Sequence, residues 1–187
     1  MQIKNIVKIM IGGMLLVSCE TISETECVAG NWSDLGYRDG VSGKSRTRIA
    51  KYVEKCGEFG QDVDRNTYLT NYETGLTHYC TYDKGFSIGE NGSSYNAVCE
   101  GPQAAEFRAG YDDGHALYEL HQEYERYQNN IDDTENQIAD VRSRVSDPEI
   151  SADEKKRLSK KLRRLKNDLK DLRWDFRHFR QEYDLDW

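Results

Sequence analysis

The stretch GYRDG at residues 36–40 places two glycines four positions apart around an aromatic ring. The same spacing returns as GFSIG at 85–89 and GYDDG at 110–114, and as NYETG at 71–75 with the small residue Asn71 in the first position. On a helix, positions i and i+4 share one face, so small residues there let a second backbone approach closely. Each glycine in a helix interior costs up to about 1 kcal/mol, which close packing of tyrosines is expected to offset. The expected packing motif comprises Gly36, Tyr37, Gly40, Tyr72, Gly75, Gly85, Gly89, Gly110, Tyr111 and Gly114.

Start signals around these pentapeptides predict short helices. The expected segments run from caps at Ser33 and Asp34 through Tyr52, from a cap at Asp64 to Tyr79, and from Pro102 through Leu120. The stretch GFSIGENGSSY at 85–95 is rich in glycine, so we expect a loop there, braced by a cysteine bridge.

From residue 117 the pattern predicts a long antiparallel helical hairpin of coiled-coil type. The first apolar seam consists of Leu117, Leu120, Tyr124, Tyr127, Ile131, Thr134, Ile138, Val141 and Val145. The second consists of Leu158, Leu162, Leu165, Leu169, Leu172, Phe176, Phe179 and Tyr183. Between them, Pro148 cannot continue a helix interior, and Ser151 with Glu154 forms a capping box for the second helix. Tyr118, Trp174 and Trp187 fall outside the seams and are candidates for a second contact surface.

The two hairpin segments carry opposite charge. Residues 117–145 have seven acids and three bases, net −4, whereas residues 152–183 have six acids and twelve bases, net +6. Opposite charges beside an apolar seam guide pairing, although an exposed ion pair contributes only a fraction of a kcal/mol. The basic run 155–170 is therefore interpreted first as a solvated face matched to its acidic neighbour. Binding to lipopolysaccharide phosphates or acidic glycan is the alternative, and association of hairpins from two chains is a third possibility.

The first eighteen residues have the features of a cleaved secretory signal: Lys4, Lys8 and an apolar core too short to span a bilayer. The sequence LVSC at 16–19 resembles the lipobox of bacterial lipoproteins, which predicts a lipid on Cys19 and a membrane partner through that anchor. Glu20 favours the outer membrane over the outer face of the inner membrane. Residues 19–26 then form a short tether. Loss of two lysines changes the net charge from −7 to −9, which argues against binding to nucleic acid or to anionic lipid across the whole surface.

Four cysteines remain: Cys27, Cys56, Cys80 and Cys99. An even number in an exported chain indicates two disulfides. Short local loops favour Cys27–Cys56 with Cys80–Cys99, and the two other pairings stay open. A zinc site is the less favoured alternative, because no two of these cysteines have the close spacing of such sites.

In order along the chain, W-x₃-GYRDG-x₂-G, Y-x₂-NYETGLTHYC and KGFSIGENGSSYNAVC resemble a family of Gram-negative envelope lipoproteins known as domain of unknown function 2799. The matching positions are Trp32, Gly36, Tyr37, Asp39, Gly40, Gly43, Tyr68, Tyr72, Gly75, Leu76, Tyr79, Cys80, Gly85, Gly89, Gly92, Tyr95 and Cys99. Asn71 stands where another glycine is more usual. The resemblance covers residues 19–120 and implies an exported lipoprotein with a small cysteine-bridged domain. It implies no reaction.

Residues typical of catalysis are sparse. The most site-like group is Asp112, Asp113 and His115, for which a polar surface turn is the simpler interpretation. His78 lies beside Cys80, but a disulfide-bonded cysteine offers no thiolate. Tyrosine-rich helices could instead form a sugar-stacking groove. No cofactor, no metal site and no enzymatic activity are expected, and an envelope hydrolase is the least favoured alternative.

The sequence therefore predicts a mainly α protein with four parts: a signal (1–18), a lipidated tether (19–26), a cysteine-bridged domain (27–116) and an antiparallel hairpin (117–187). The expected function is that of a periplasm-facing structural or adaptor lipoprotein that acts through its hairpin. Its expected partner is an envelope protein or peptidoglycan.

Overall fold

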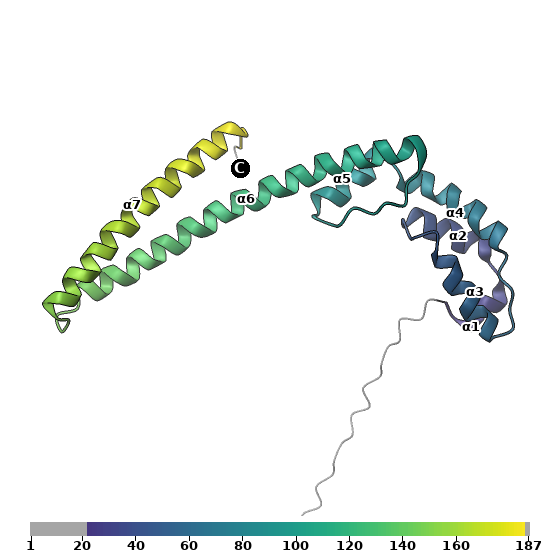
Figure 1. Cartoon of the computed structure of the whole chain (residues 1–187), viewed down its shortest axis with the longest axis horizontal. Helices are drawn as coiled ribbons and strands as arrows, with labels where there is room; N and C mark the ends of the chain where they lie inside the picture. The colour runs from purple at the N-terminus through teal and green to yellow at the C-terminus, as the bar shows by residue number, and fades with distance from the viewer. Residues whose placement is uncertain (1–21, 186–187) are drawn as a thin grey trace, which may run out of the picture. The chain divides into compact units, whose positions relative to one another are not determined.

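The computed structural model describes residues 22–185, and within that range all regular structure is helical (Figure 1). The expected mainly α fold, with short helices followed by a long hairpin, is confirmed. The chain divides after Tyr79 into two compact units, which are described separately. The expected lipidation at Cys19 and the contact residue Trp187 lie outside the described residues.

The first unit contains four helices: α1 (Glu24–Ala29), α2 (Trp32–Val41), α3 (Arg48–Glu58) and α4 (Arg65–Tyr79). The short helix α1 begins with a capping box between Ser23 and Glu26. The Cys27–Cys56 disulfide joins α1 to α3, with the Cα atoms 5.4 Å apart. The helices α2 and α4 pack face to face and bury the tyrosine core of this unit.

The helix expected from Ser33 through Tyr52 is wrong, because the chain turns between α2 and α3. Gly43 has a φ of +61° in this turn, a conformation that glycine adopts without strain. The turn reverses the chain, so that Tyr52 of α3 reaches the α2–α4 pair. The cap at Asp64 is confirmed, since its carboxylate accepts a hydrogen bond from the Thr67 amide at 2.9 Å.

The second unit begins with α5 (Tyr82–Glu90), where the sequence predicted a loop. That prediction is wrong for residues 85–90, because Gly85 and Gly89 lie on one face of the helix and pack against a neighbour, and correct for residues 91–95. The Thr81 side chain caps the helix by accepting from the Lys84 amide. The actual loop follows α5 and ends at the Cys80–Cys99 disulfide, whose Cα atoms are 5.7 Å apart. Both disulfides are therefore those that the sequence favoured.

The helices α6 (Gly101–Val145) and α7 (Ala152–Glu182) form the expected hairpin (Figure 1). Pro102 occupies the first turn of α6, and the Ser151 side chain caps α7 by accepting from the Glu154 amide. The helix α6 runs without a break through residues 116 and 117, where the sequence analysis separated two domains. Its first part packs on α5, and the remainder pairs with α7.

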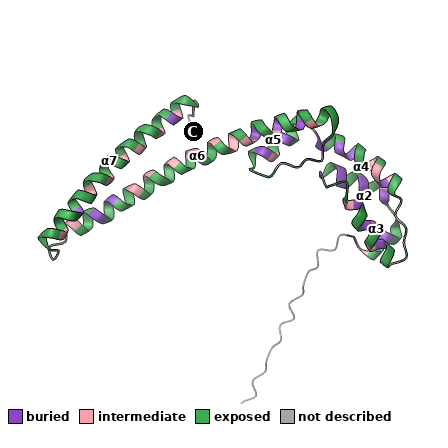
Figure 2. Cartoon of the chain, in the orientation of Figure 1, coloured by how far each residue is buried: buried purple, intermediate pink, exposed green. Residues whose placement is uncertain are grey.

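The predicted seams match the burial of the hairpin. Every seam position is buried or half-buried except Tyr183, which is 50 % exposed and follows the end of α7. Ile138, Val141, Leu158 and Phe179 are buried, whereas the other seam residues keep partial exposure because two helices cover only one side of each other. In Figure 2 both long helices are mostly exposed. Across residues 22–185, no helix combines the length and apolar character needed to cross a membrane.

Candidate functional site

Glycines bring α2 and α4 into backbone contact in the first unit, at a contact we call the first clasp (Gly36, Gly40 and Gly75). A Cβ atom on Gly36 would collide with the Tyr68 carbonyl, and one on Gly40 with the Tyr72 carbonyl. From the other helix, a Cβ on Gly75 would lie 2.8 Å from the Val41 amide nitrogen. A larger residue at any of the three positions would push the two helices apart.

A second clasp joins α5 to α6 through Gly85, Gly89, Gly110 and Gly114. A Cβ on Gly85 would collide with the Phe107 carbonyl, and one on Gly89 with the Tyr111 carbonyl. The glycines of α6 face α5 in the same manner. A Cβ on Gly110 would collide with the Tyr82 carbonyl, and one on Gly114 with the Phe86 carbonyl. All four pentapeptides of the sequence analysis therefore lie in helix contacts, which confirms the packing motif at its glycines.

The two clasps are copies of one arrangement. Each glycine of α5 lies 49 positions after its counterpart in α2, and Gly114 of α6 lies 39 positions after Gly75 of α4. The correspondence extends beyond the glycines, because Gly43 packs under the Tyr79 ring as Gly92 packs under the Tyr118 ring.

A tyrosine closes each clasp in the same way. The Tyr72 hydroxyl donates to the Lys44 carbonyl at 2.6 Å, and the Tyr111 hydroxyl donates to the Ser93 carbonyl at 3.1 Å. These residues keep the same offsets of 39 and 49. The chain thus contains an internal duplication of a helix pair together with its closing turn.

The copies differ in a buried polar cluster found in the first one. Asp39 of α2 is 8 % exposed and accepts hydrogen bonds from the hydroxyls of Tyr52 and Tyr68 at 2.7 and 2.8 Å. Arg48 donates to the Tyr52 hydroxyl and lies 3.6 Å from the Asp39 carboxylate. At the corresponding positions the second copy has Ile88 for Asp39 and Phe107 for Tyr68.

The environment of this cluster shifts the pKa values of both phenols upward. Burial, followed by the hydrogen bond to Asp39, raises the pKa of Tyr52 to about 12. The same two causes raise the pKa of Tyr68 further. Both hydroxyls therefore keep their protons and act as donors to a single carboxylate. A fully bonded cluster of this kind fixes how α2, α3 and α4 pack.

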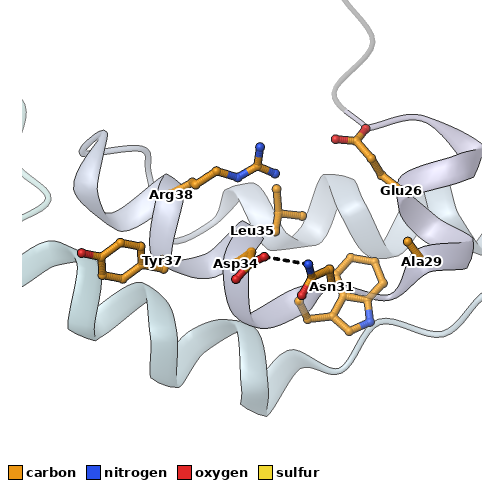
Figure 3. A pocket seen from close by; sticks show the side chains of 8 residues that line it. Glu26, Ala29, Asn31, Asp34, Leu35, Tyr37 and Arg38 are labelled. Atoms are coloured by element: carbon orange, nitrogen blue, oxygen red, sulfur yellow. Dashed lines mark hydrogen bonds between the residues drawn. The ribbon is translucent and has the colours of Figure 1, made fainter.

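An open hollow of about 400 Å³ lies beside α1 and α2, a volume within the range of small-ligand sites (Figure 3). Its lining includes the rings of Trp32 and Tyr37 and the charged groups of Asp34 and Arg38. Asn31 donates to the Asp34 carboxylate at 2.7 Å, as the dashed line in Figure 3 marks. Aromatic rings beside amide, carboxylate and guanidinium groups can stack on a sugar and bond to its hydroxyls.

The side chains of Asp112, Asp113 and His115, the most site-like group in the sequence, do not come together in the structure. Asp112 pairs with Arg108, and Asp113 accepts from the Tyr82 hydroxyl. His115 stacks on the Tyr111 ring and faces Glu119 at 3.6 Å. Within residues 22–185, no group of three or more His, Cys, Asp or Glu side chains could hold a metal ion.

The helices α6 and α7 are held together by ion pairs and by contacts between aromatic rings. Arg173 pairs with Glu135, and Arg144 pairs with Glu154 at 3.2 Å. The Phe176 ring packs against Tyr124 with the ring centroids 5.0 Å apart. These contacts fix the antiparallel register and leave most charged side chains of α7 facing solvent.

A family model described as a protein of unknown function, DUF2799, matches residues 31–116. We call this part of the chain the DUF2799 region. The region starts at the first turn of α2 and ends two residues after Gly114, so it contains both clasps and the buried cluster. The hairpin seams, which begin at Leu117, lie beyond the DUF2799 match. Searches of curated proteins and of solved structures gave no match.

Proposed function

We propose that the chain is a lipid-anchored envelope lipoprotein, facing the periplasm, with a non-enzymatic structural or adaptor role. In this proposal each clasp of the DUF2799 region is a rigid helix pair, and the hairpin is the element that contacts other molecules. The close backbone contacts of the two glycine clasps and the two disulfides restrict movement of the helices that they join.

The half-buried seam of the hairpin is the observation that carries this proposal. Leu162, Leu165, Leu169 and Leu172 all remain partly exposed in the described chain. Trp174, outside the seam, is 53 % exposed. Apolar side chains that stay partly exposed along two long, charged helices favour binding to a partner that would cover them.

Photo-crosslinking in cells tests the adaptor role. A reactive side chain is placed at Arg163, Lys170 or Asp171, all of which are exposed, and adducts are identified by mass spectrometry. A discrete envelope-protein adduct supports the proposal and identifies the partner. Adducts confined to the same chain or to further copies of it contradict the adaptor role and leave a structural spacer.

The anchor is tested separately at Cys19. We expect the chain to incorporate a labelled fatty acid and to fractionate with the outer membrane, and Cys19→Ser to abolish the label. Fractionation with the inner membrane would place the anchor on that membrane's outer face. Equal labelling of Cys19→Ser would refute the lipidation.

Glycan binding is the second candidate function, favoured by the hollow beside α1 and α2. The exposed Tyr37 ring and the Asn31–Asp34 pair are suited to a sugar. We expect sedimentation of the mature chain with purified peptidoglycan to decrease for Tyr37→Ala. Tyr82→Ala is the matched control, because Tyr82 is equally exposed and lies in the second unit.

A further inference from the structure

The two flanks of α7 beside its seam differ in charge. One flank, the basic stripe, consists of Lys156, Arg163, Lys166, Lys170, Arg173, Arg177 and Arg180 and contains no acid. Steps of three, four or seven residues place these side chains along one side of the helix. The opposite flank holds five of the six acids of α7: Glu154, Asp168, Asp171, Asp175 and Glu182. The opposite flank therefore has mixed charge, since Arg157, Lys161 and Arg164 also lie there, whereas the basic stripe is uniformly positive.

Neighbouring acids of α6 neutralise the basic stripe only in part. The Arg173–Glu135 ion pair shows which flank of α6 lies beside the stripe. By heptad position, that flank contributes three acids: Glu125, Asp132 and Glu135. Three carboxylates beside seven bases leave this face of the hairpin strongly positive.

The stripe is exposed and carries an aromatic side chain. Six of its seven residues are exposed, and Arg180 is half-buried. Trp174, 53 % exposed, lies one helical turn from both Lys170 and Arg177. An exposed indole among lysines and arginines is typical of helices that lie at a membrane–water interface.

We propose that the basic stripe and Trp174 dock onto the anionic phospholipid headgroups of a bilayer surface. The stripe lies on the convex outer surface of the helix and is about 36 Å long, because Lys156 and Arg180 are 24 residues apart and each residue rises about 1.5 Å. Mobile lipids can gather along such a surface, since each basic side chain needs only a nearby phosphate. A second copy of the chain matches the stripe less well, because the other flank of α6 offers four acids, Glu119, Glu123, Asp133 and Asp140, against seven bases.

The overall acidity of the chain does not oppose this docking. Charges more than about 10 Å away are largely screened at moderate ionic strength, so the local stripe governs the contact. The inference rests on the proposed function only in taking the hairpin as the interaction element. A basic stripe and a lipid on Cys19 would together supply more than one membrane signal, as stable anchoring requires.

Vesicle co-sedimentation tests the proposal with the full mature chain carrying Cys19→Ser, so that no acyl chain contributes. We expect binding to phosphatidylglycerol-containing vesicles, no binding to phosphatidylcholine alone, and weakening with salt. Arg163→Gln with Lys170→Gln should weaken binding about 30-fold, at roughly fivefold for each basic side chain. The matched control, Lys161→Gln with Arg164→Gln, removes the same charge from the opposite flank and should change binding less than about twofold.

Equal weakening by both charge pairs, or no binding to anionic vesicles, would overturn the proposal while leaving the crosslinking test and the Cys19 test of the function intact. Quenching of tryptophan fluorescence by brominated lipids should decrease in Trp174→Phe. Binding to heparin as tight as to vesicles, without lipid quenching, would assign the stripe to soluble polyanions instead. Dimerisation in sedimentation that the stripe variant abolishes, without vesicle binding, would assign it to a second copy.

Discussion

Gly40 of α2 and Gly75 of α4 face each other so closely that a Cβ on Gly75 would lie 3.0 Å from the Gly40 Cα. Neither position has room for a methyl group. The two helices touch through their backbones, and the tyrosines of the core flank this contact. In the second unit, a Cβ on Gly89 would lie 3.1 Å from the carbonyl carbon of Gly114.

Replacing Gly40 with alanine should destabilise the first unit by at least about 2–3 kcal/mol, because the new methyl group would collide with backbone atoms that cannot move alone. The obstructing atoms include the Leu76 amide nitrogen, at 2.8 Å. Urea unfolding followed by circular dichroism measures the loss.

Gly57→Ala is the control for this effect. A Cβ at Gly57 of α3 would meet nothing within 4 Å, so the change should be neutral or should stabilise by about 0.5 kcal/mol through helix propensity. Equal destabilisation by both substitutions would contradict the steric account.

The buried cluster should show strong coupling between Asp39 and Tyr68. Asp39→Ile leaves the hydroxyls of Tyr52 and Tyr68 without their acceptor, at about 1–3 kcal/mol for each unpaired group. Tyr68→Phe removes one of these hydroxyls, so the double variant, which copies Ile88 and Phe107, should lose less than the two single variants combined. A double-mutant cycle in urea should give a coupling of at least about 1 kcal/mol. Additive effects would show that the two groups act independently.

Alkaline pH should destabilise the first unit through the same phenols. The pKa of Tyr52 is raised to about 12, so stability is full below the unfolded tyrosine pKa of about 10 and falls as the pH rises toward the folded value. Tyr68 acts in the same direction, since its pKa is also raised. Above about pH 10, the loss approaches 1.4 kcal/mol per pH unit for each tyrosine. Tyr68→Phe should reduce this slope in unfolding measured across the alkaline range, and an unchanged slope would exclude its contribution.

The helix α1 should depend on the Cys27–Cys56 disulfide. With six residues it is too short to be stable alone, and this bond joins it to α3. Replacing both cysteines with alanine should lower stability by about 3 kcal/mol and remove hydrogen-exchange protection from residues 24–29. The matched pair Cys80→Ala with Cys99→Ala should leave that protection intact. Loss of protection in both variants would mean that the units unfold together.

The hairpin could be predicted almost residue by residue, because burial of one helical face imposes the heptad spacing on the sequence. Tyr183 is the exception: it continues the spacing, but α7 ends at Glu182. By contrast, α5 was predicted as a loop, because glycine is a poor helix former and propensity alone cannot reveal a neighbouring backbone. Gly85 and Gly89 are favourable only because α6 lies against them.

The cluster at Asp39 was missed because its partners are distant along the chain. Tyr52 and Tyr68 lie 13 and 29 positions away, and no local spacing connects them. Aligning the duplicated segments could have revealed it, since Asp39 and Tyr68 change together to Ile88 and Phe107. The stripe on α7, which depends only on helical spacing, was visible in the sequence as a basic run but was not resolved into flanks.

The continuity of α6 makes the second clasp and the hairpin one mechanical element. Its 45 residues form a rod of about 68 Å with no hinge at residues 116 and 117. Rotation of the second clasp about the axis of α6 therefore rotates the basic stripe by the same angle. One residue inserted after Ala116 would rotate the hairpin about 100° against the clasp, direct the stripe elsewhere and move the Tyr118 ring away from Gly92. The number of residues between Gly114 and Leu117 therefore determines the angle, about the axis of α6, between the second clasp and the hairpin.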